Sequence, residues 1–207
     1  MSSSPEAARP GDAGKRWIFA AALLGLGAVA ALGLSSLALD WQPARIWREP
    51  WRAWSAALVH LSPLHLAANL AGCAVVGALG GVARVPRRSV TAWLVAWPLT
   101  QLALLARPDL THYAGLSGVL HAGVAVVAVH LVATARGARQ AVGLALLAAL
   151  ALKVASESPF AADPISLREG WDIAIAPFAH AAGLAAGALA SALAEALAHR
   201  PPYHRRQ

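Results

Sequence analysis

Hydrophobic residues fall into six long runs along the chain, and short polar connections separate the runs. Each run comes close to the about 20 residues that an α-helix needs to cross a bilayer. Because backbone polar groups must be paired inside a membrane, such runs are expected to be helical. The pattern predicts an all-α polytopic membrane protein, a bundle of six transmembrane helices. The predicted spans are Trp17–Leu39, Pro63–Val82, Ser89–Ala106, Tyr113–Ala135, Gln140–Ser156 and Ile173–Ala198.

The composition agrees with a membrane protein. Of the 207 residues, 58% are hydrophobic and 13% are charged, whereas soluble domains average about 25% charged residues. The chain has one cysteine, Cys73, which excludes an internal disulfide and a multi-cysteine metal site. We therefore predict a protein without a metal or other cofactor.

Basic residues predict the orientation of the spans, because cytoplasmic loops of membrane proteins carry an excess of Lys and Arg. With the N-terminus inside, eleven of the 17 Lys and Arg residues fall in inner segments and five in outer loops, and Lys153 lies within the fifth span. This bias predicts that both termini are cytoplasmic. The net charge of +7 is thereby explained by the basic residues of the predicted cytoplasmic segments, and we expect no nucleic-acid partner.

The two ends of the chain differ from the hydrophobic region between them. Residues 1–14 are polar and rich in Ser, Ala, Pro and Gly, which predicts a disordered cytoplasmic tail. Residues 15–199 form the predicted six-helix membrane domain, and residues 200–207 a basic cytoplasmic tail. The first hydrophobic run is longer than the core of a cleaved signal peptide, so we expect it to be retained.

Two short motifs within the predicted spans contain the candidate catalytic residues. Ser117 lies between Gly115 and Gly118, and His180 begins the last span's glycine motif. A serine hydroxyl becomes a nucleophile when a base accepts its proton, and imidazole is a base suited to neutral pH. A Gly-x-Ser-Gly segment is also typical of a helix interface built from small residues. The catalytic interpretation therefore depends on the partners of Ser117.

The glycines after His180 suggest which helix lies beside it. Gly183 and Gly187 follow on or near the same face and allow a neighbouring helix to approach closely. We expect that neighbour to be the helix with Ser117. Counted from Asp172 at about 1.5 Å per residue, His180 should lie about 12 Å into its span.

His65 and Asn69 are one turn apart on the second predicted span, which Ser62 and Pro63 are expected to begin as N-cap and first residue. Both side chains can donate hydrogen bonds to an oxyanion. No Asp or Glu is expected within reach of His180. The pattern therefore predicts a catalytic dyad rather than a triad.

Four motifs follow one another in this order: Trp51-Arg52, His60-Leu-Ser-Pro-Leu-His65-Leu-Ala-Ala-Asn69, Gly115-Leu-Ser117-Gly118 and His180-x-x-Gly183-x-x-x-Gly187. Together they resemble the rhomboid family of intramembrane serine proteases over roughly residues 17–198. The resemblance implies a Ser117–His180 dyad with oxyanion stabilisation by His65 and Asn69. It also implies a first outer loop embedded sideways in the outer leaflet, anchored by Arg52, and membrane-anchored protein substrates.

Residue 121 departs from the pattern of many rhomboids, which have a tyrosine four residues after the nucleophile. His121 could compete with His180 for protons, and we favour His180 as the base. His121, the compact loops and the segment with Lys153 and Glu157 resemble the rhombosortase subgroup, which implies substrates with a C-terminal Gly-Gly motif, membrane helix and basic cluster. Lys153 and Glu157 are an i,i+4 pair, either a lysine that reaches the surface with a solvated partner or a structural or substrate-contacting pair.

Three other functions are alternatives to the protease. A non-catalytic relative that binds transmembrane helices would normally have lost Ser117 or His180. A zinc protease using His60 and His65 lacks the His-Glu-x-x-His motif, and a small transporter needs polar groups through the full membrane depth. The Ala- and Arg-rich composition suggests a bacterium, in which case the protein lies in the inner membrane and its site opens to the periplasm.

Overall fold

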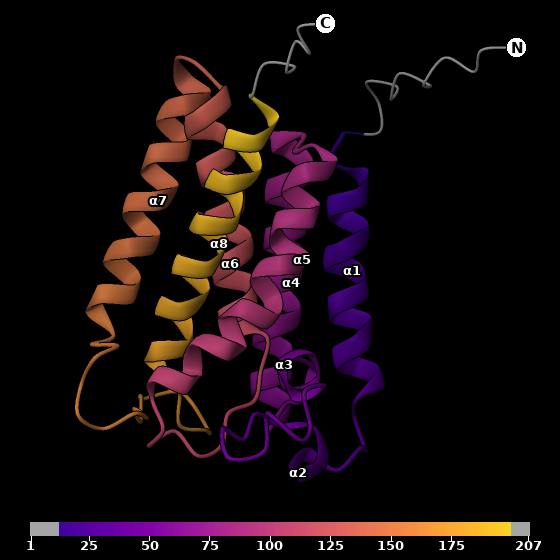
Figure 1. The fold of residues 1–207 in the computed structure, drawn as a ribbon, viewed down its shortest axis with the longest axis vertical. Coiled ribbons are helices and arrows are strands. Elements are labelled where there is room, and N and C mark those ends of the chain that lie inside the picture. The colour runs from indigo at the N-terminus through magenta and orange to yellow at the C-terminus, as the bar shows by residue number, and fades with distance from the viewer. Residues whose placement is uncertain (1–12, 200–207) are drawn as a thin grey trace, which may run out of the picture.

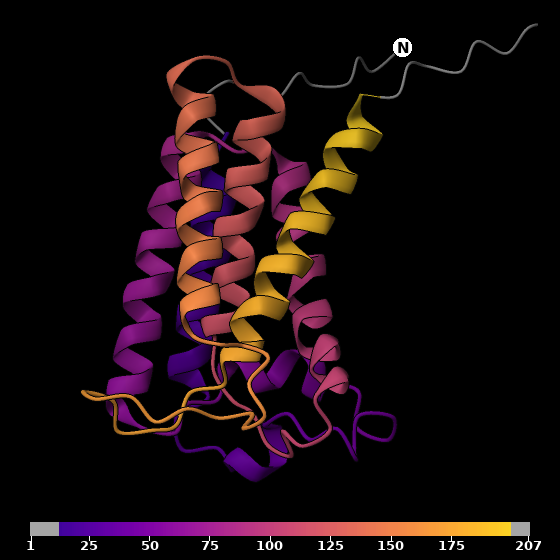
Figure 2. The ribbon, with the colours of Figure 1, turned by 90° about the vertical axis from the view of Figure 1, so that its left-hand side faces the viewer.

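The computed structural model describes residues 13–199, and every named element in this part of the chain is a helix. The expected N-terminal tail, apart from Ala13 and Gly14, and the expected tail over residues 200–207 lie outside the described residues. The long helices lie side by side as a bundle (Figures 1 and 2). They are α1 (Lys15–Ala30), α4 (Pro63–Ala83), α5 (Arg87–Ala103), α6 (Ser117–Thr134), α7 (Ala138–Ser156) and α8 (Pro177–Ala198). The short elements are α2 (Ser36–Leu39), α3 (Arg52–Ser55), η2 (Ala56–Leu58) and η3 (Leu104–Ala106).

Five of the described helices are long and apolar enough to cross a membrane: α4, α5 extended by η3, α6, α7 and α8. Helix α1 has 16 residues, or roughly 24 Å at 1.5 Å per residue, which is less than the about 30 Å of a hydrocarbon core. The prediction of one continuous helix over Trp17–Leu39 is therefore wrong. The chain leaves the helix after Ala30, passes Gly33 in the left-handed region (φ +84°), and forms the separate α2. The count of six spans is accordingly not confirmed.

Two helices begin one turn later than the hydrophobic pattern predicts. Helix α6 begins at Ser117 instead of Tyr113, after Gly115 has turned the backbone at φ +121°. Helix α8 begins at Pro177, a residue whose fixed φ suits the first helical position. His180 therefore lies in the first turn of α8, and the expectation that it sits about 12 Å into the helix is wrong.

The start of α4 matches its sequence prediction. Ser62 is the N-cap, and its hydroxyl accepts a hydrogen bond from the backbone N–H of His65 at 3.0 Å. Pro63 occupies the first helical position. This cap places His65 in the first turn and Asn69 one turn later on the same face, and both side chains are buried.

Helix α6 is the centre of the bundle and packs against α4, α5, α7 and α8. Its closest neighbour is α8, which approaches at Gly183 and Gly187. A β-carbon at Gly183 would collide with the carbonyl oxygen of Gly118, and one at Gly187 with that of Ala122. The close approach that the glycine spacing predicts is therefore present, and it joins the helices that carry Ser117 and His180.

Two tryptophans join α1 to the centre of the bundle. Trp17 and Trp93 stack with ring centroids 4.3 Å apart. Their indole N–H groups donate to the carbonyl oxygens of Val76 at 2.7 Å and Val119 at 2.8 Å. Both indoles are thus buried with their polar atoms paired. Although α1 is short, it is packed firmly against α4 and α5.

The first loop, between α1 and α4, is anchored by the buried Arg52. Its guanidinium donates to the carbonyl oxygens of Asp40 at 2.7 Å and Leu37 at 3.1 Å. It also forms ion pairs with the carboxylates of Asp40 and Glu49. Arg52 therefore joins distant parts of the first loop through their backbone carbonyls, which agrees with the expectation that Arg52 anchors this loop.

Replacing Gly187 with valine should destabilise the bundle, because the added side chain meets the backbone of Ala122. Overpacking of this kind costs about 1–3 kcal/mol. The thermal unfolding midpoint of G187V in detergent should fall clearly below that of the wild type. A185V is the matched control, since Ala185 is exposed on the same helix. Equal midpoints for the two variants would contradict the close α6–α8 contact.

Replacing Arg52 with alanine should loosen the first loop. The change leaves the buried carboxylate of Asp40 without its guanidinium, and removing one partner of a buried ion pair costs about 3–5 kcal/mol. Limited proteolysis should cut R52A within residues 40–61 faster than the wild type. R45A removes an exposed arginine that pairs with the same Glu49 and should be cut at the wild-type rate.

Candidate active site

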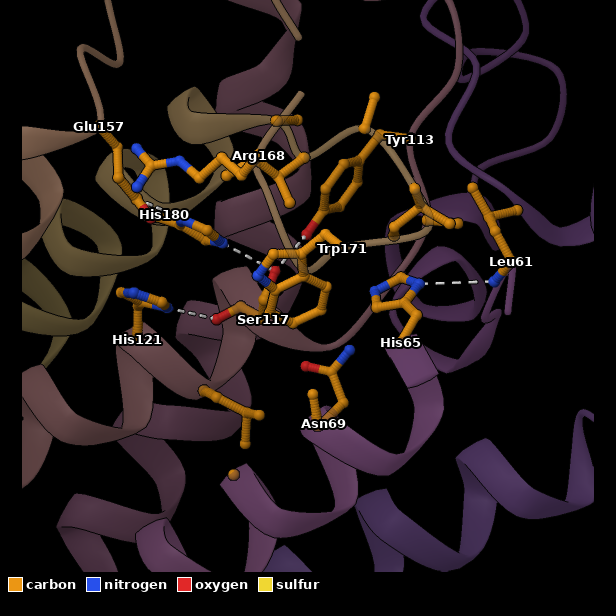
Figure 3. A pocket seen from close by; sticks show the side chains of 18 of the residues that line it. Leu61, His65, Asn69, Tyr113, Ser117, His121, Glu157, Arg168, Trp171 and His180 are labelled. Carbon is orange, nitrogen blue, oxygen red and sulfur yellow. Dashed lines mark hydrogen bonds and ion pairs between the residues drawn. The ribbon is translucent and has the colours of Figure 1, made fainter. Parts of the chain in front are cut away.

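A cavity of about 590 Å³ lies at the end of the bundle where α4, α6 and α8 begin and α7 ends. Its walls come from these helices and from the loops that precede α6 and α8. Polar side chains from segments far apart in the sequence meet there (Figure 3). Those with ionisable or hydrogen-bonding groups are His65, Asn69, His112, Tyr113, Ser117, His121, Lys153, Glu157, Arg168, Trp171 and His180.

Ser117 and His180 form the centre of this site. Ser117 is the first residue of α6 and His180 lies in the first turn of α8, so the close helix contact brings them together. The hydroxyl oxygen of Ser117 lies 3.0 Å from Nε2 of His180. At this distance the imidazole can accept the hydroxyl proton, which is the arrangement of an activated serine nucleophile.

A carboxylate faces the other side of the His180 ring. Oε2 of Glu157 lies 2.6 Å from Nδ1 of His180, and both side chains are buried. The expectation that no Asp or Glu lies within reach of His180 is therefore wrong. Helix α7 ends at Ser156, and Glu157 follows it at the depth of the α8 start, so its side chain turns toward α8 rather than toward solvent. Its place directly after the fifth predicted span was the signal that could have revealed it.

Lys153, one turn before Glu157, contacts both Glu157 and His121. Its ammonium group lies 2.9 Å from Oε1 of Glu157 and 2.7 Å from Nε2 of His121. The Glu157 side chain is only 6% exposed. Glu157 is therefore a buried partner in the cavity rather than a solvated one, whereas the Lys153 side chain is 43% exposed.

His121 lies one turn after Ser117 and stacks on His180. The ring centroids are 4.2 Å apart and the planes differ by 11°. Nδ1 of His121 lies 2.6 Å from the backbone carbonyl oxygen of Ser117, so this nitrogen carries a proton and donates it. His121 therefore packs against the candidate base while its own ring is held by the α6 backbone.

His65 and Asn69 line the opposite wall of the cavity from α4 (Figure 3). Nδ1 of His65 accepts a hydrogen bond from the backbone N–H of Leu61 at 3.4 Å. In that tautomer Nε2 carries the proton and is available as a donor to the cavity. The amide of Asn69 makes no hydrogen bond to residues 13–199 and is likewise free to donate. Both groups line the same cavity as Ser117.

Tyr113 and Gly115 shape the approach to Ser117, and the sequence pattern did not single out Tyr113. The buried phenol donates to the carbonyl oxygen of Gly115 at 3.1 Å and lies 3.5 Å from the Ser117 hydroxyl. Burial raises the pKa of Tyr113, which keeps the phenol protonated at neutral pH. A β-carbon at Gly115 would collide with His65, so glycine is required for this close approach.

The remaining predicted site residues lie outside the cavity lining. Gly118, Gly183 and Gly187 form the α6–α8 contact, and Trp51 and Arg52 belong to the first loop. Their positions connect them with the site through packing rather than through contact with a reacting group.

Comparison with protein-family models places the residues of this site within a known domain. The Rhomboid domain family model matches residues 47–196, which include every polar side chain of the cavity. A comparison with curated proteins finds no match.

Replacing Gly115 with alanine should disable Ser117 as a nucleophile, because the new methyl group displaces His65 from the cavity wall. Misplacement by about 1 Å can reduce reactivity about a hundredfold. The measurement is the rate at which a fluorophosphonate probe labels the protein in detergent. G33A is the matched control, since Gly33 also has a positive φ but nothing lies within 4 Å of its added carbon. Labelling of G115A at the rate of G33A would contradict this view of the site.

Proposed function

The chain belongs to the rhomboid family, and we propose that it is an intramembrane serine protease with Ser117 as nucleophile and His180 as general base. The observation that carries the proposal is the 3.0 Å contact between the Ser117 hydroxyl and Nε2 of His180 at the edge of a polar cavity. Rhomboid proteins act on membrane protein substrates in the bilayer. The expected substrates are therefore membrane-anchored proteins that reach the cavity from the lipid side.

The proposed reaction follows from the positions of the donors and acceptors. Ser117 attacks the peptide carbonyl carbon while its proton moves to Nε2 of His180. The carbonyl oxygen becomes an oxyanion, which His65, Asn69 and the backbone N–H of Ser117 can stabilise. His180 then returns its proton to the leaving amine, the C–N bond breaks, and an acyl-enzyme remains. Water entering the cavity hydrolyses the ester with His180 again as base.

We propose six membrane passages with both termini in the cytoplasm. The backbone N–H of Gly14, just before α1, donates to the carbonyl oxygen of Val85 at 3.1 Å. Glu195, near the end of α8, pairs with Arg88 at 2.9 Å. Both contacts lie at the α4–α5 turn, so the start of α1 and the end of α8 share one end of the bundle (Figure 1). An even number of passages accounts for this, with α1 as a short span.

The charge bias of the loops gives the direction of the bundle. Within residues 13–199, the end opposite the cavity carries Lys15, Arg16, Arg84, Arg87, Arg88, Arg136 and Arg139, and the loops at the cavity end carry Arg45, Arg48, Arg52, Arg107 and Arg168. This excess favours the end opposite the cavity as cytoplasmic. In a bacterium the protein then lies in the inner membrane and the site opens to the periplasm. The first loop, on the cavity side, is expected to lie in the outer leaflet.

For the substrate class we propose proteins with a C-terminal Gly-Gly sorting tail, as rhombosortases are thought to process. The support is the resemblance at His121 and at the pair Lys153 and Glu157. All three side chains take part in the polar network around His180, so the features that mark the resemblance lie at the site itself.

Fluorophosphonate labelling tests the proposed nucleophile and base. The wild type should be labelled in detergent, and S117A and H180A should lose labelling while keeping the wild-type unfolding midpoint. S191A is the control, because this buried serine of α8 bonds to the Val126 carbonyl away from the cavity. Labelling of S117A would overturn the proposal, and an unlabelled but folded wild type would favour a protein that binds transmembrane helices without cutting them.

Cleavage of a membrane-anchored reporter with a Gly-Gly tail tests the substrate class. Co-expression with the wild type should release the reporter's soluble domain, and co-expression with S117A should not. A reporter in which both glycines are replaced by leucine is the matched control. Equal release of both reporters would leave the protease assignment intact and contradict the Gly-Gly specificity.

A further inference from the structure

We propose that Glu157 is a positioning residue that holds His180 in its catalytic orientation, and that Lys153 fixes the charge of Glu157 and the tautomer of His121. The protein then works with a Ser117–His180–Glu157 triad rather than a dyad. This inference rests on the proposed function, since it assigns residues that support the same nucleophile and base.

The contacts form a closed ring that begins and ends on Ser117, and Figure 3 labels four of its members, Ser117, His121, Glu157 and His180. The Ser117 hydroxyl contacts His180, His180 contacts Glu157, and Glu157 contacts Lys153. Lys153 contacts His121, whose second nitrogen returns to the Ser117 backbone carbonyl. Every link is between 2.6 and 3.0 Å.

One assignment of protons satisfies all these links. The Ser117 carbonyl can only accept, so Nδ1 of His121 carries a proton and Nε2 accepts from the ammonium group of Lys153. The Glu157 carboxylate accepts from Lys153 and from Nδ1–H of His180. Nε2 of His180 is then unprotonated and accepts from the Ser117 hydroxyl. The 3.1 Å approach of Lys153 to Nδ1 of His180 joins two donors and is not a hydrogen bond in this assignment.

With the protons placed in this way, only one of the two histidines can accept the proton of Ser117. Both ring nitrogens of His121 are occupied, one by the Ser117 carbonyl and one by Lys153. His121 has no lone pair for the Ser117 proton, whereas His180 directs its own lone pair at that hydroxyl. Lys153 thereby excludes His121 as a competing base.

The Glu157 carboxylate also stabilises His180 during the proposed reaction. When His180 accepts the Ser117 proton it becomes an imidazolium, and Glu157 is 2.6 Å from Nδ1. A buried carboxylate at this position stabilises the positive ring without taking its proton, as in other serine protease triads. The proton on Nδ1 stays on His180 throughout.

The protein contains a similar cluster that serves as an internal comparison. At the other end of the bundle the buried Glu195 contacts Nδ1 of His130 at 2.8 Å and pairs with Arg88. This cluster also joins a carboxylate, an imidazole and a cation, but it lies away from the cavity, and no serine of residues 13–199 bonds to a side chain of the cluster. A purely structural role for Glu157 predicts that the two carboxylates behave alike when they are replaced.

The test measures the inactivation rate constant, kinact, and the binding constant, KI, of a fluorophosphonate probe. In E157Q an amide must face both the ammonium group of Lys153 and Nδ1–H of His180, and its single oxygen satisfies only one of them. We expect kinact to fall by about 10²- to 10⁴-fold, the upper value being typical when the orienting carboxylate of a triad is replaced, while KI stays unchanged. E157D should recover part of kinact, and E195Q should lower the unfolding midpoint while leaving kinact unchanged.

Lys153 gives a second, independent variant. K153M removes a charge-assisted hydrogen bond to Glu157 and frees Nε2 of His121, and we expect kinact to fall about tenfold. K153R keeps the charge and should recover more of kinact than K153M. Equal kinact values for K153M and the wild type would overturn the role of Lys153.

The outcomes separate this inference from the proposed function. If labelling requires Ser117 and His180 but E157Q keeps the wild-type kinact, the dyad holds and the triad is overturned. If E157Q and E195Q lose labelling in proportion to their loss of folded protein, the role of Glu157 is structural and the triad is again overturned. If E157Q does not fold, E157D decides the matter, since its carboxylate is one methylene further from His180. An unchanged kinact in E157D would then overturn the triad.

Discussion

The contact between α6 and α8 is the constraint on which the rest of the structure depends. Without side chains at Gly183 and Gly187, the backbone of α8 lies directly against Gly118 and Ala122 of α6. Because both helices begin close to this contact, their first turns meet, and these turns carry Ser117 and His180. A single added methyl group at either glycine would separate the two helices and, with them, the side chains of Ser117 and His180.

Ionisable side chains inside a membrane protein are stable only when they neutralise one another. Besides the Arg52 ion pairs of the first loop, two clusters of paired ionisable side chains lie at opposite ends of the bundle. Around Glu195, the imidazole of His130 and the guanidinium of Arg88 join α5, α6 and α8. Around Glu157 the same kinds of groups open onto a cavity and include a serine. The ion pairs around Glu195 thus join helices at one end of the bundle. At the other end, the contacts of Glu157 also determine which nitrogen of His180 carries a proton.

The short α1 shows that length alone does not decide whether a helix belongs to the bundle. Trp17 stacks on Trp93 and donates to the backbone of α4, so α1 is held by packing and hydrogen bonding. The first loop, anchored by Arg52, continues from it to the α4 start that positions His65. The cavity wall that carries His65 and Asn69 therefore depends on segments remote from it in sequence.

The sequence by itself determined the helical class, the start of α4, the glycine contact and the pairing of Ser117 with His180, because these follow from local hydropathy, capping residues and helical periodicity. The sequence did not show where α6 and α8 begin, because the apolar residues just before each helix extend the hydrophobic run. Only the tertiary structure decided that Glu157 and Lys153 face His180 and His121. The direction of a side chain at a helix end depends on which helix packs beside it. The same local sequence therefore allows a residue just beyond a span to face lipid, water or a neighbouring helix.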